Sequence, residues 1–322
     1  MVNKLLFSLL SLLCPLAVSV ANAQSFPSRP ISIVVPVSPG GIVDLAGRLA
    51  AEALSNSLNQ SVVVENRPGA SANIGYAHVA QAKPDGYTLL ASYSLYHVVN
   101  PLIFSKLSWK PESFTPVGRV ATTPSVVVVP TSLPVNNLKE FVEYAKKNPG
   151  AISFASQGSG SVSHLGSELL KQATGIEMVH VPYKGSGPAM QDLIAGRVQF
   201  FVTAPPAVLG HIQQGRLRAL AIAGSERHAL LPDVPTSVEQ GFPAFQLNPW
   251  VSVFAPAGTP AAEIRKLSQA LEAGLKQPDL VARGKRAGAE IDYQAPDALA
   301  KTVQDEGAHW AVVVKAAKIT AD

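Results

Sequence analysis

The chain has 322 residues, is 47% hydrophobic and carries a formal net charge of +4, so it is long enough to bury two cores. Its basic residues are scattered and form no Lys/Arg-rich run, which excludes the electrostatic footprint of nucleic-acid binding. Beyond the N-terminal segment, no stretch of 18 consecutive apolar residues occurs, which excludes a further membrane-spanning helix.

The N-terminal segment has the pattern of a secretory signal. A basic start, an apolar run over 5–20 and a small-x-small motif at 21–23 predict a signal peptide over residues 1–23, with a retained anchor as the alternative. Cys14 is the single cysteine, and Leu13 precedes it where a lipoprotein signal has a small residue, so we expect no lipid. A mature chain without cysteine suits the bacterial periplasm, which we predict as its location.

Strand-like and helix-like patterns then alternate. In the first run, strands are expected at 31–37, 61–66 and 87–92, and helices at 42–54 and 73–82. The segment 93–116 is rich in aromatic residues and prolines and is expected to be irregular.

The alternation restarts at residue 125. The expected strands of this second run are 125–130, 151–156, 177–183, 198–203 and 217–223. The expected helices between them are 138–145, 165–170 and 190–194. A last strand at 250–256 precedes two helices, at 264–275 and 299–314.

This alternation predicts an α/β protein of two lobes, each a mainly parallel sheet flanked by helices. The last two helices have too few strands to form a third domain, so we expect them to return to the first. The predicted lobes are 24–122 with 254–322, and 123–253. Chain crossings of this kind are typical of a hinged protein with a cleft.

Glycine-rich turns follow three of the expected strands. The turns are "SPGG" (38–41), "QGSGSVSH" (157–164) and "KGSG" (184–187). Ligands bind beyond the carboxyl ends of parallel strands, and glycine lets a ligand approach the backbone. The free N–H groups and the dipole of a following helix favour an anion. Two such turns would hold a carboxylate, although Ser38 and Ser161 are also explained as plain helix N-caps.

The sequence gives little support for a catalytic, dinucleotide or metal site. Asp44, in the first turn of a helix, either complements the helix dipole or binds a positive group of a ligand. "GSGSVS" resembles a dinucleotide fingerprint, but Ser163 replaces its third glycine. No G-x-S-x-G motif occurs, so His164 is expected to line the site rather than to catalyse. The seven histidines have no metal-binding spacing. We therefore expect no catalytic residue, no cofactor and no metal.

Longer stretches of the chain resemble the Bug family of periplasmic solute receptors of tripartite tricarboxylate transporters. The resemblance lies in "FPSRPISIVVPVSPGGIVDLAGRLAAEAL", "VVVENRPGASANIGYAHVAQAKPDGYTLL", "NPGAISFASQGSGSVSHLGSELL", "MVHVPYKGSGPAMQDLIAGRVQF" and "GRLRALAIAGSERHALLPDVPT", and it covers nearly all of the mature chain in order and spacing. It implies a Venus flytrap fold, as in periplasmic binding proteins. It also implies a small organic acid between the lobes, its carboxylate held by backbone amides of the two facing strand–helix loops.

The resemblance and the turns together define a predicted ligand-binding set. Its members are Val37, Ser38, Pro39, Gly40, Gly41, Asp44, Ala72, Asn73, Ser92, Tyr93, Ser94, Gly158, Ser159, Ser161, Ser163, His164, Tyr183, Thr203 and Ala204.

Two departures from the family pattern make the predicted site more apolar. Ile42-Val43 stand where many relatives have Ala-Thr or Ala-Ser, and "VTAPP" (202–206) where many have an acid or Asn. Lys184 is the only basic side chain expected at the strand ends. This favours a carboxylate with an aromatic or apolar body over a tricarboxylate, with Tyr93, Tyr96 and Tyr183 packing on that body.

The sequence thus predicts a monomeric periplasmic solute-binding protein that delivers a small carboxylate to membrane transporter subunits or to a signalling partner. The alternative is a secreted α/β enzyme acting on a small carboxylic acid. A protein that binds no small molecule is a third hypothesis.

Overall fold

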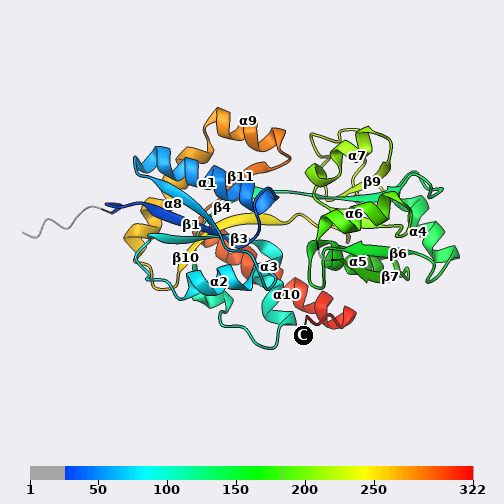
Figure 1. Cartoon of the computed structure of the whole chain (residues 1–322), viewed down its shortest axis with the longest axis horizontal. Helices are drawn as coiled ribbons and strands as arrows, with labels where there is room; N and C mark the ends of the chain where they lie inside the picture. Colours follow the sequence, from blue (N-terminus) through cyan, green and yellow to red (C-terminus); the bar gives the residue numbers. More distant parts are fainter. Residues whose placement is uncertain (1–25, 184, 322) are drawn as a thin grey trace, which may run out of the picture.

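A six-stranded sheet with helices on both faces forms the core of the first lobe. The computed structural model describes residues 26–183 and 185–321, and Figure 1 shows the two lobes side by side along its long axis. The strand order is β11-β4-β10-β3-β1-β2. The strands are β1 (Ile31–Val35), β2 (Val62–Asn66), β3 (Thr88–Tyr93), β4 (Phe114–Thr122), β10 (Trp250–Pro256) and β11 (Glu290–Gln294).

Each face of this sheet has its own apolar cluster, because side chains alternate along a strand. Ile33 and Val35 of β1 pack with α1 and α8, and Val34 packs on the other face with Tyr76 of α2. β1 is therefore hydrophobic except at Ser32, as expected for a strand covered on both sides. The helices of this lobe are α1 (Ile42–Leu58), α2 (Asn73–Ala80), α3 (Ser94–Ile103), α8 (Ala261–Leu275), α9 (Pro278–Arg286) and α10 (Pro296–Ala317), with a 3-10 turn η1 (Pro111–Ser113).

The second lobe, drawn mainly in green in Figure 1, contains two small sheets joined by a bridge between Phe154 and Phe200. One sheet has the order β8-β5-β9, and β6 pairs with β7 in the other. The strands are β5 (Ser125–Pro130), β6 (Ser153–Ser156), β7 (Val179–Pro182), β8 (Phe201–Thr203) and β9 (Leu217–Ala223). The helices are α4 (Leu138–Lys147), α5 (Val162–Thr174), α6 (Ser186–Ile194) and α7 (Leu209–Gln213), with a 3-10 turn η2 (Pro205–Ala207).

The α/β architecture with helix-flanked sheets is confirmed, but the sheets are mixed rather than mainly parallel. β1 pairs in parallel with β2 and β3, whereas β10 is antiparallel to both β3 and β4. The reason is the connection between the lobes. β4 carries the chain out of the first lobe and β10 brings it back, so these neighbours run in opposite directions.

The expectation of an irregular segment at 93–116 is wrong. Residues 94–103 form α3 despite Pro101, and β4 begins at Phe114. The helix holds because its apolar side chains Val98 and Val99 are buried, so tertiary packing outweighs the weak local propensity. The pattern also missed α9 and β11, which follow α8.

The crossing between lobes lies near residues 123–125 and 247–249. Thr123 N–H donates to the carbonyl of Pro249 at 2.9 Å, and Ser125 N–H donates to that of Leu247 at 3.0 Å. The outward crossing agrees with the predicted limit at 122/123, whereas the return crossing precedes the predicted limit at 253/254, because β10 already begins at Trp250. The lobe limits 24–122 with 254–322 and 123–253 stay a proposal. The predicted signal peptide, residues 1–23, lies outside the described residues.

Helix α10 packs on both lobes. Leu299, in its first turn, belongs to the cluster of Trp250 and Phe254, whereas Trp310 and Val313 belong to the cluster that holds the second lobe's core. Helix α3 joins this second cluster as well. On this side the lobes therefore share one continuous apolar interior.

A second contact between the lobes forms at Gly288, in the turn between α9 and β11. A Cβ built on Gly288 would lie 2.5 Å from Pro206 Cγ in the second lobe. Burial lowers the pKa of His228 in that lobe, and a hydrogen bond to the Gly288 backbone partly opposes this. The lobes thus approach so closely here that only a glycine fits.

We predict that Gly288→Ala separates the lobes at this contact. Gly241→Ala is the matched control: the two glycines have φ of +76° and +88°, but Gly241 has no atom within 4 Å of a built Cβ. Both variants bear the same left-handed strain of about 1 kcal/mol. Spin labels at Lys147→Cys and Lys276→Cys of the mature chain report the distance between lobes. Only Gly288→Ala is expected to lengthen it, and equal distances in the two variants would contradict the steric account.

Candidate functional site

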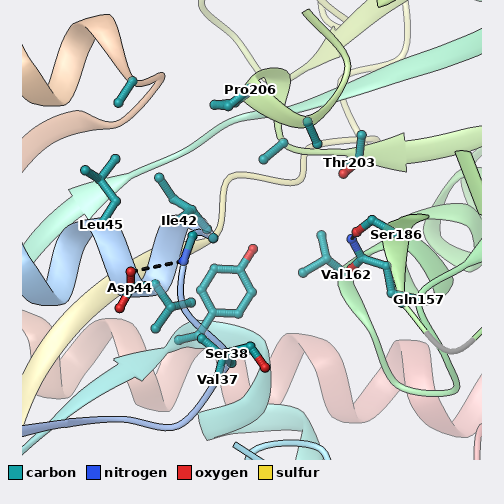
Figure 2. Close-up of a pocket in the computed structure, with 18 of the residues that line it drawn as sticks. Val37, Ser38, Ile42, Asp44, Leu45, Gln157, Val162, Ser186, Thr203 and Pro206 are labelled. Atoms are coloured by element: carbon teal, nitrogen blue, oxygen red, sulfur yellow. Dashed lines mark hydrogen bonds between the residues drawn. The ribbon is translucent and has the colours of Figure 1, made fainter. Parts of the chain in front are cut away.

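A cleft of about 810 Å³ lies between the lobes, a volume within the usual range for small-molecule sites. Figure 2 shows Ile42 on one side of the open space, facing Val162, Ser186 and Gln157 on the other. The first lobe contributes Val37, Ser38, Gly40, Gly41, Ile42, Val43, Asp44, Leu45, Arg48, Tyr93, Tyr96 and Ala287. The second contributes Gln157, Val162, Gly185, Ser186, Thr203, Ala204, Pro206 and Ala207.

The turn between β1 and α1 presents backbone to the cleft. Gly40 has φ of +95°, and Gly41 is the N-cap of α1 without a side-chain cap. The first N–H groups of a helix have no acceptor within it, so those of Ile42 and Val43 are available at the cleft surface. Their partial positive charge makes this turn suited to an anion.

The Asp44 carboxylate holds this turn in place. It accepts from the Gly40 N–H at 3.0 Å (Figure 2), from Arg48 Nε and Nη2 at 3.0 and 3.1 Å, and from Asn66 Nδ2 at 2.9 Å. Asn66 Nδ2 also donates to the Val37 carbonyl at 3.0 Å. Both carboxylate oxygens are therefore engaged, and the turn is tied to α1 and to the end of β2.

The electrostatic balance at Asp44 favours its charged form. Burial alone would raise the pKa of this carboxyl, but the hydrogen bonds from Arg48, Asn66 and Gly40 hold the pKa below its usual value. The acid in the first turn thus does more than complement the helix dipole, because it binds the backbone of the glycine turn directly.

The second lobe presents the start of α6 and a nearby amide. Gly185, with φ of +108°, is the N-cap of α6 without a side-chain cap, and Ser186 follows it. Gln157 Nε2 donates to Ser186 Oγ at 2.6 Å. Since both residues line the cleft, α6 faces it with free N–H groups and a hydroxyl.

Eight members of the predicted ligand-binding set line the cleft. They are Val37, Ser38, Gly40, Gly41, Asp44, Tyr93, Thr203 and Ala204. Tyr93 is only 6% exposed, and its ring centroid lies 5.6 Å from that of Tyr96. Burial raises the pKa of both phenols, so they are neutral at physiological pH.

Other members of the set in the first lobe lie behind the cleft and bond to the scaffold. Ser92 Oγ bonds Tyr76 OH at 2.7 Å, and Ser94 Oγ accepts from Trp250 N–H at 3.3 Å. Asn73 Oδ1 accepts from Asn100 and Trp109. Ala72 is buried against the sheet, and Pro39 is exposed next to the cleft lining.

The members of the set in the turn at 157–164 mostly bond to each other. Ser161 Oγ donates to the Gly158 carbonyl at 2.6 Å and caps α5, and Ser163 Oγ accepts from Gln157 N–H. Ser159 belongs to the same turn but does not line the cleft.

The two remaining side chains of the set in this lobe are also engaged away from the cleft. His164 Nδ1 accepts from Gly160 N–H, and its ring stacks on His180 with centroids 3.9 Å apart. Burial lowers the pKa of His164 to about 4, so it is neutral. Tyr183 OH donates to Asp192, and Lys184 lies outside the described residues.

Several lining residues escaped the predicted set. Ser186 and Gly185 belong to the "KGSG" turn, so the turn pattern signalled their place. Pro206 and Ala207 follow the predicted strand end at Thr203. Ala287 carried no signal, because it follows α9, which the sequence pattern did not reveal.

The described residues form neither a metal-binding cluster nor a membrane-spanning helix. Within residues 26–183 and 185–321, no group of three or more His, Cys, Asp or Glu side chains could hold a metal ion. In the same part of the chain, no helix has the length and hydropathy to cross a membrane.

Asp44 yields a prediction about stability and pH. Asp44→Asn is expected to lower the free energy of unfolding by about 2 kcal/mol at pH 7. The amide nitrogen of Asn is itself a donor and cannot accept the hydrogen bonds that a carboxylate oxygen accepts at this position. The folded-state pKa of Asp44 lies below its unfolded value, so its contribution is full above the unfolded pKa and lost as pH falls through the folded one. The difference between wild type and variant therefore shrinks towards pH 3.

Urea unfolding from pH 7 to pH 3 measures this difference. Asp305→Asn is the control, because its ion pair with Lys301 is exposed on both sides and contributes little. A loss of stability at Asp44→Asn that does not change with pH would contradict the charged role.

Comparison with known proteins agrees with this architecture. A family model described as "Tripartite tricarboxylate transporter family receptor" matches residues 46–319. Protein BugT of Bordetella pertussis is 39% identical over 296 residues, which cover 91% of this chain and 91% of BugT.

Solved structures give the same result. A protein of R. palustris with adipate is 35% identical, with a TM-score of 0.82, over 92% of this chain and 99% of that one. The periplasmic binding protein BugD is 36% identical, with a TM-score of 0.78, over 92% and 99%. MatC from Rhodopseudomonas palustris with bound malate is 34% identical, with a TM-score of 0.78, over 90% and 100%. The resemblance to the Bug proteins is confirmed, and the chain belongs to the receptor family of tripartite tricarboxylate transporters.

Proposed function

We propose that this receptor captures a small carboxylate in the periplasm and delivers it to a tripartite tricarboxylate-type transporter or to a signalling partner. The observation that carries the proposal is the start of α1, where the uncapped Gly41 and the following N–H groups face the cleft. Similar structures hold adipate and malate, both carboxylates. The proposal includes secretion by the signal peptide over 1–23 and a monomeric state.

The binding mode in this proposal joins both lobes. The start of α1 takes one side of the carboxylate, and the start of α6 with Ser186 takes the other. The body of the ligand then lies among Ile42, Val162 and Pro206, which favours an apolar or aromatic body.

Binding without catalysis is part of the proposal. The described cleft lining offers the hydroxyls of Ser38, Ser186 and Thr203 and the neutral phenols of two tyrosines, but no histidine, lysine or cysteine that would activate a hydroxyl. The single carboxylate of this lining, Asp44, is already bonded through both oxygens. A secreted enzyme therefore has no observation in its favour, and incubation with candidate acids is expected to give no product.

A thermal-shift screen against a panel of organic acids would identify the ligand. A ligand at a concentration of 100 times its Kd is expected to stabilise the protein by about 2.7 kcal/mol. A panel in which no acid changes the unfolding temperature would contradict the proposal.

We predict that Gly41→Val weakens binding of the acid found in this screen by at least about tenfold, because its side chain enters the ligand's space. The backbone of Gly41 has φ of −91°, and no protein atom lies within 4 Å of a built Cβ. The variant is therefore expected to fold normally.

Gly307→Val in α10 is the matched control, since Gly307 also has free space around a built Cβ and does not line the cleft. Titration calorimetry of the three proteins gives the affinities. Binding to Gly41→Val within a factor of about two of wild type would show that the turn does not hold the carboxylate.

A further inference from the structure

The charged side chains of the cleft cancel each other. Among the described lining residues, Asp44 and Arg48 alone are charged, and they form a two-bond ion pair at 3.0 and 3.1 Å. The Asp44 side chain is only 6% exposed, so a move of Arg48 towards a ligand would leave a buried carboxylate without its cation. Arg48 is therefore committed to Asp44.

Among the described residues, the positive potential that remains comes from two helix starts. Helix α1 has 17 residues and helix α6 has nine, and each presents an uncapped N-terminus to the cleft. A helix N-terminus acts as roughly half a positive charge. The two together match one carboxylate, and the described lining residues offer no further unpaired cation for a second.

Tyr93 also points to a ligand in this cleft, because its side chain is largely buried while its hydroxyl is left free at the cleft surface. Tyr93 is 6% exposed and lines the cleft, yet its hydroxyl bonds none of the described residues. The neighbouring Tyr96, which is half-buried, also lines the cleft, and its hydroxyl bonds none of the described residues. Since burial keeps both phenols neutral, they offer hydrogen bonds and ring faces but no charge.

The rest of the lining is apolar. Ile42 and Leu45 contribute from α1, Val162 from α5, and Pro206 and Ala207 from η2. Val162 also packs against the apolar clusters of both lobes. A second carboxylate placed in this region would lose its water without gaining a cation, which is costly.

We propose that the ligand carries a single negative charge and is a monocarboxylate with an apolar or aromatic body. This inference rests on the proposed function and narrows it. It sets the chain apart from the similar structures that hold adipate and malate, each of which has two carboxylates.

Hexanoate and adipate provide the matched test, because they share a carbon chain and differ by one carboxylate. Titration calorimetry is done on the wild-type protein with both acids and with benzoate, malate and citrate. Benzoate or hexanoate is expected to bind at least about tenfold more tightly than adipate, malate and citrate, because a second charge remains unpaired.

A pair of variants tests the physical cause. Ala207 is exposed at the rim of the cleft, so Ala207→Lys adds a cation there with little risk to folding, and Ala207→Gln adds a side chain of similar length without charge. Ala207→Lys is expected to reduce the preference for hexanoate over adipate at least about fivefold, whereas Ala207→Gln leaves it unchanged.

The outcomes distinguish failure of the single-charge inference from failure of the proposed function. Adipate, malate or citrate bound as tightly as the monocarboxylates would overturn the inference but leave carboxylate capture standing. A preference that Ala207→Lys and Ala207→Gln change equally would overturn the assignment of selectivity to charge. Absence of binding for every acid would overturn the proposed function and the inference with it.

Discussion

The ion pair and hydrogen bonds of Asp44 are the constraint on which the cleft depends. The turn at Gly40, with φ of +95°, is conformationally free by itself, because glycine has no side chain to restrict its backbone. Asp44 fixes it by accepting from the Gly40 N–H, while Arg48 and Asn66 fix the carboxylate. The first N–H groups of α1 are thereby held towards the cleft before a ligand arrives. Pre-organisation of this kind reduces the entropy lost on binding.

The arrangement of the lobes brings the N–H groups at the start of α6 to the same cleft as those of α1. On one side α3 and α10 join the lobes through a continuous apolar cluster, and on another Gly288 meets Pro206. Between these contacts, the starts of α1 and α6 line one cleft (Figure 2). Neutral side chains fill most of the remaining surface, so backbone dipoles rather than ionised side chains dominate its electrostatics.

Sequence reasoning succeeded where a local pattern sets the outcome. The strands at 125–130, 217–223 and 250–256 form as predicted, because their mostly apolar residues are largely buried in the sheets. It failed at α3, where burial of Val98 and Val99 outweighs Pro101. In the cleft it located the glycine turns but not Ala287 or the engagement of Ser92, Asn73 and His164, since those depend on which distant groups the fold brings together.

The most direct test of this account is the behaviour of individual backbone amides. Proton–nitrogen NMR spectra recorded during titration with a carboxylate that binds would follow the N–H groups of Gly41, Ile42 and Ser186. The account predicts that these amide protons shift downfield and saturate together as the acid is added. Saturation of binding with shifts elsewhere and none at the starts of α1 and α6 would contradict it.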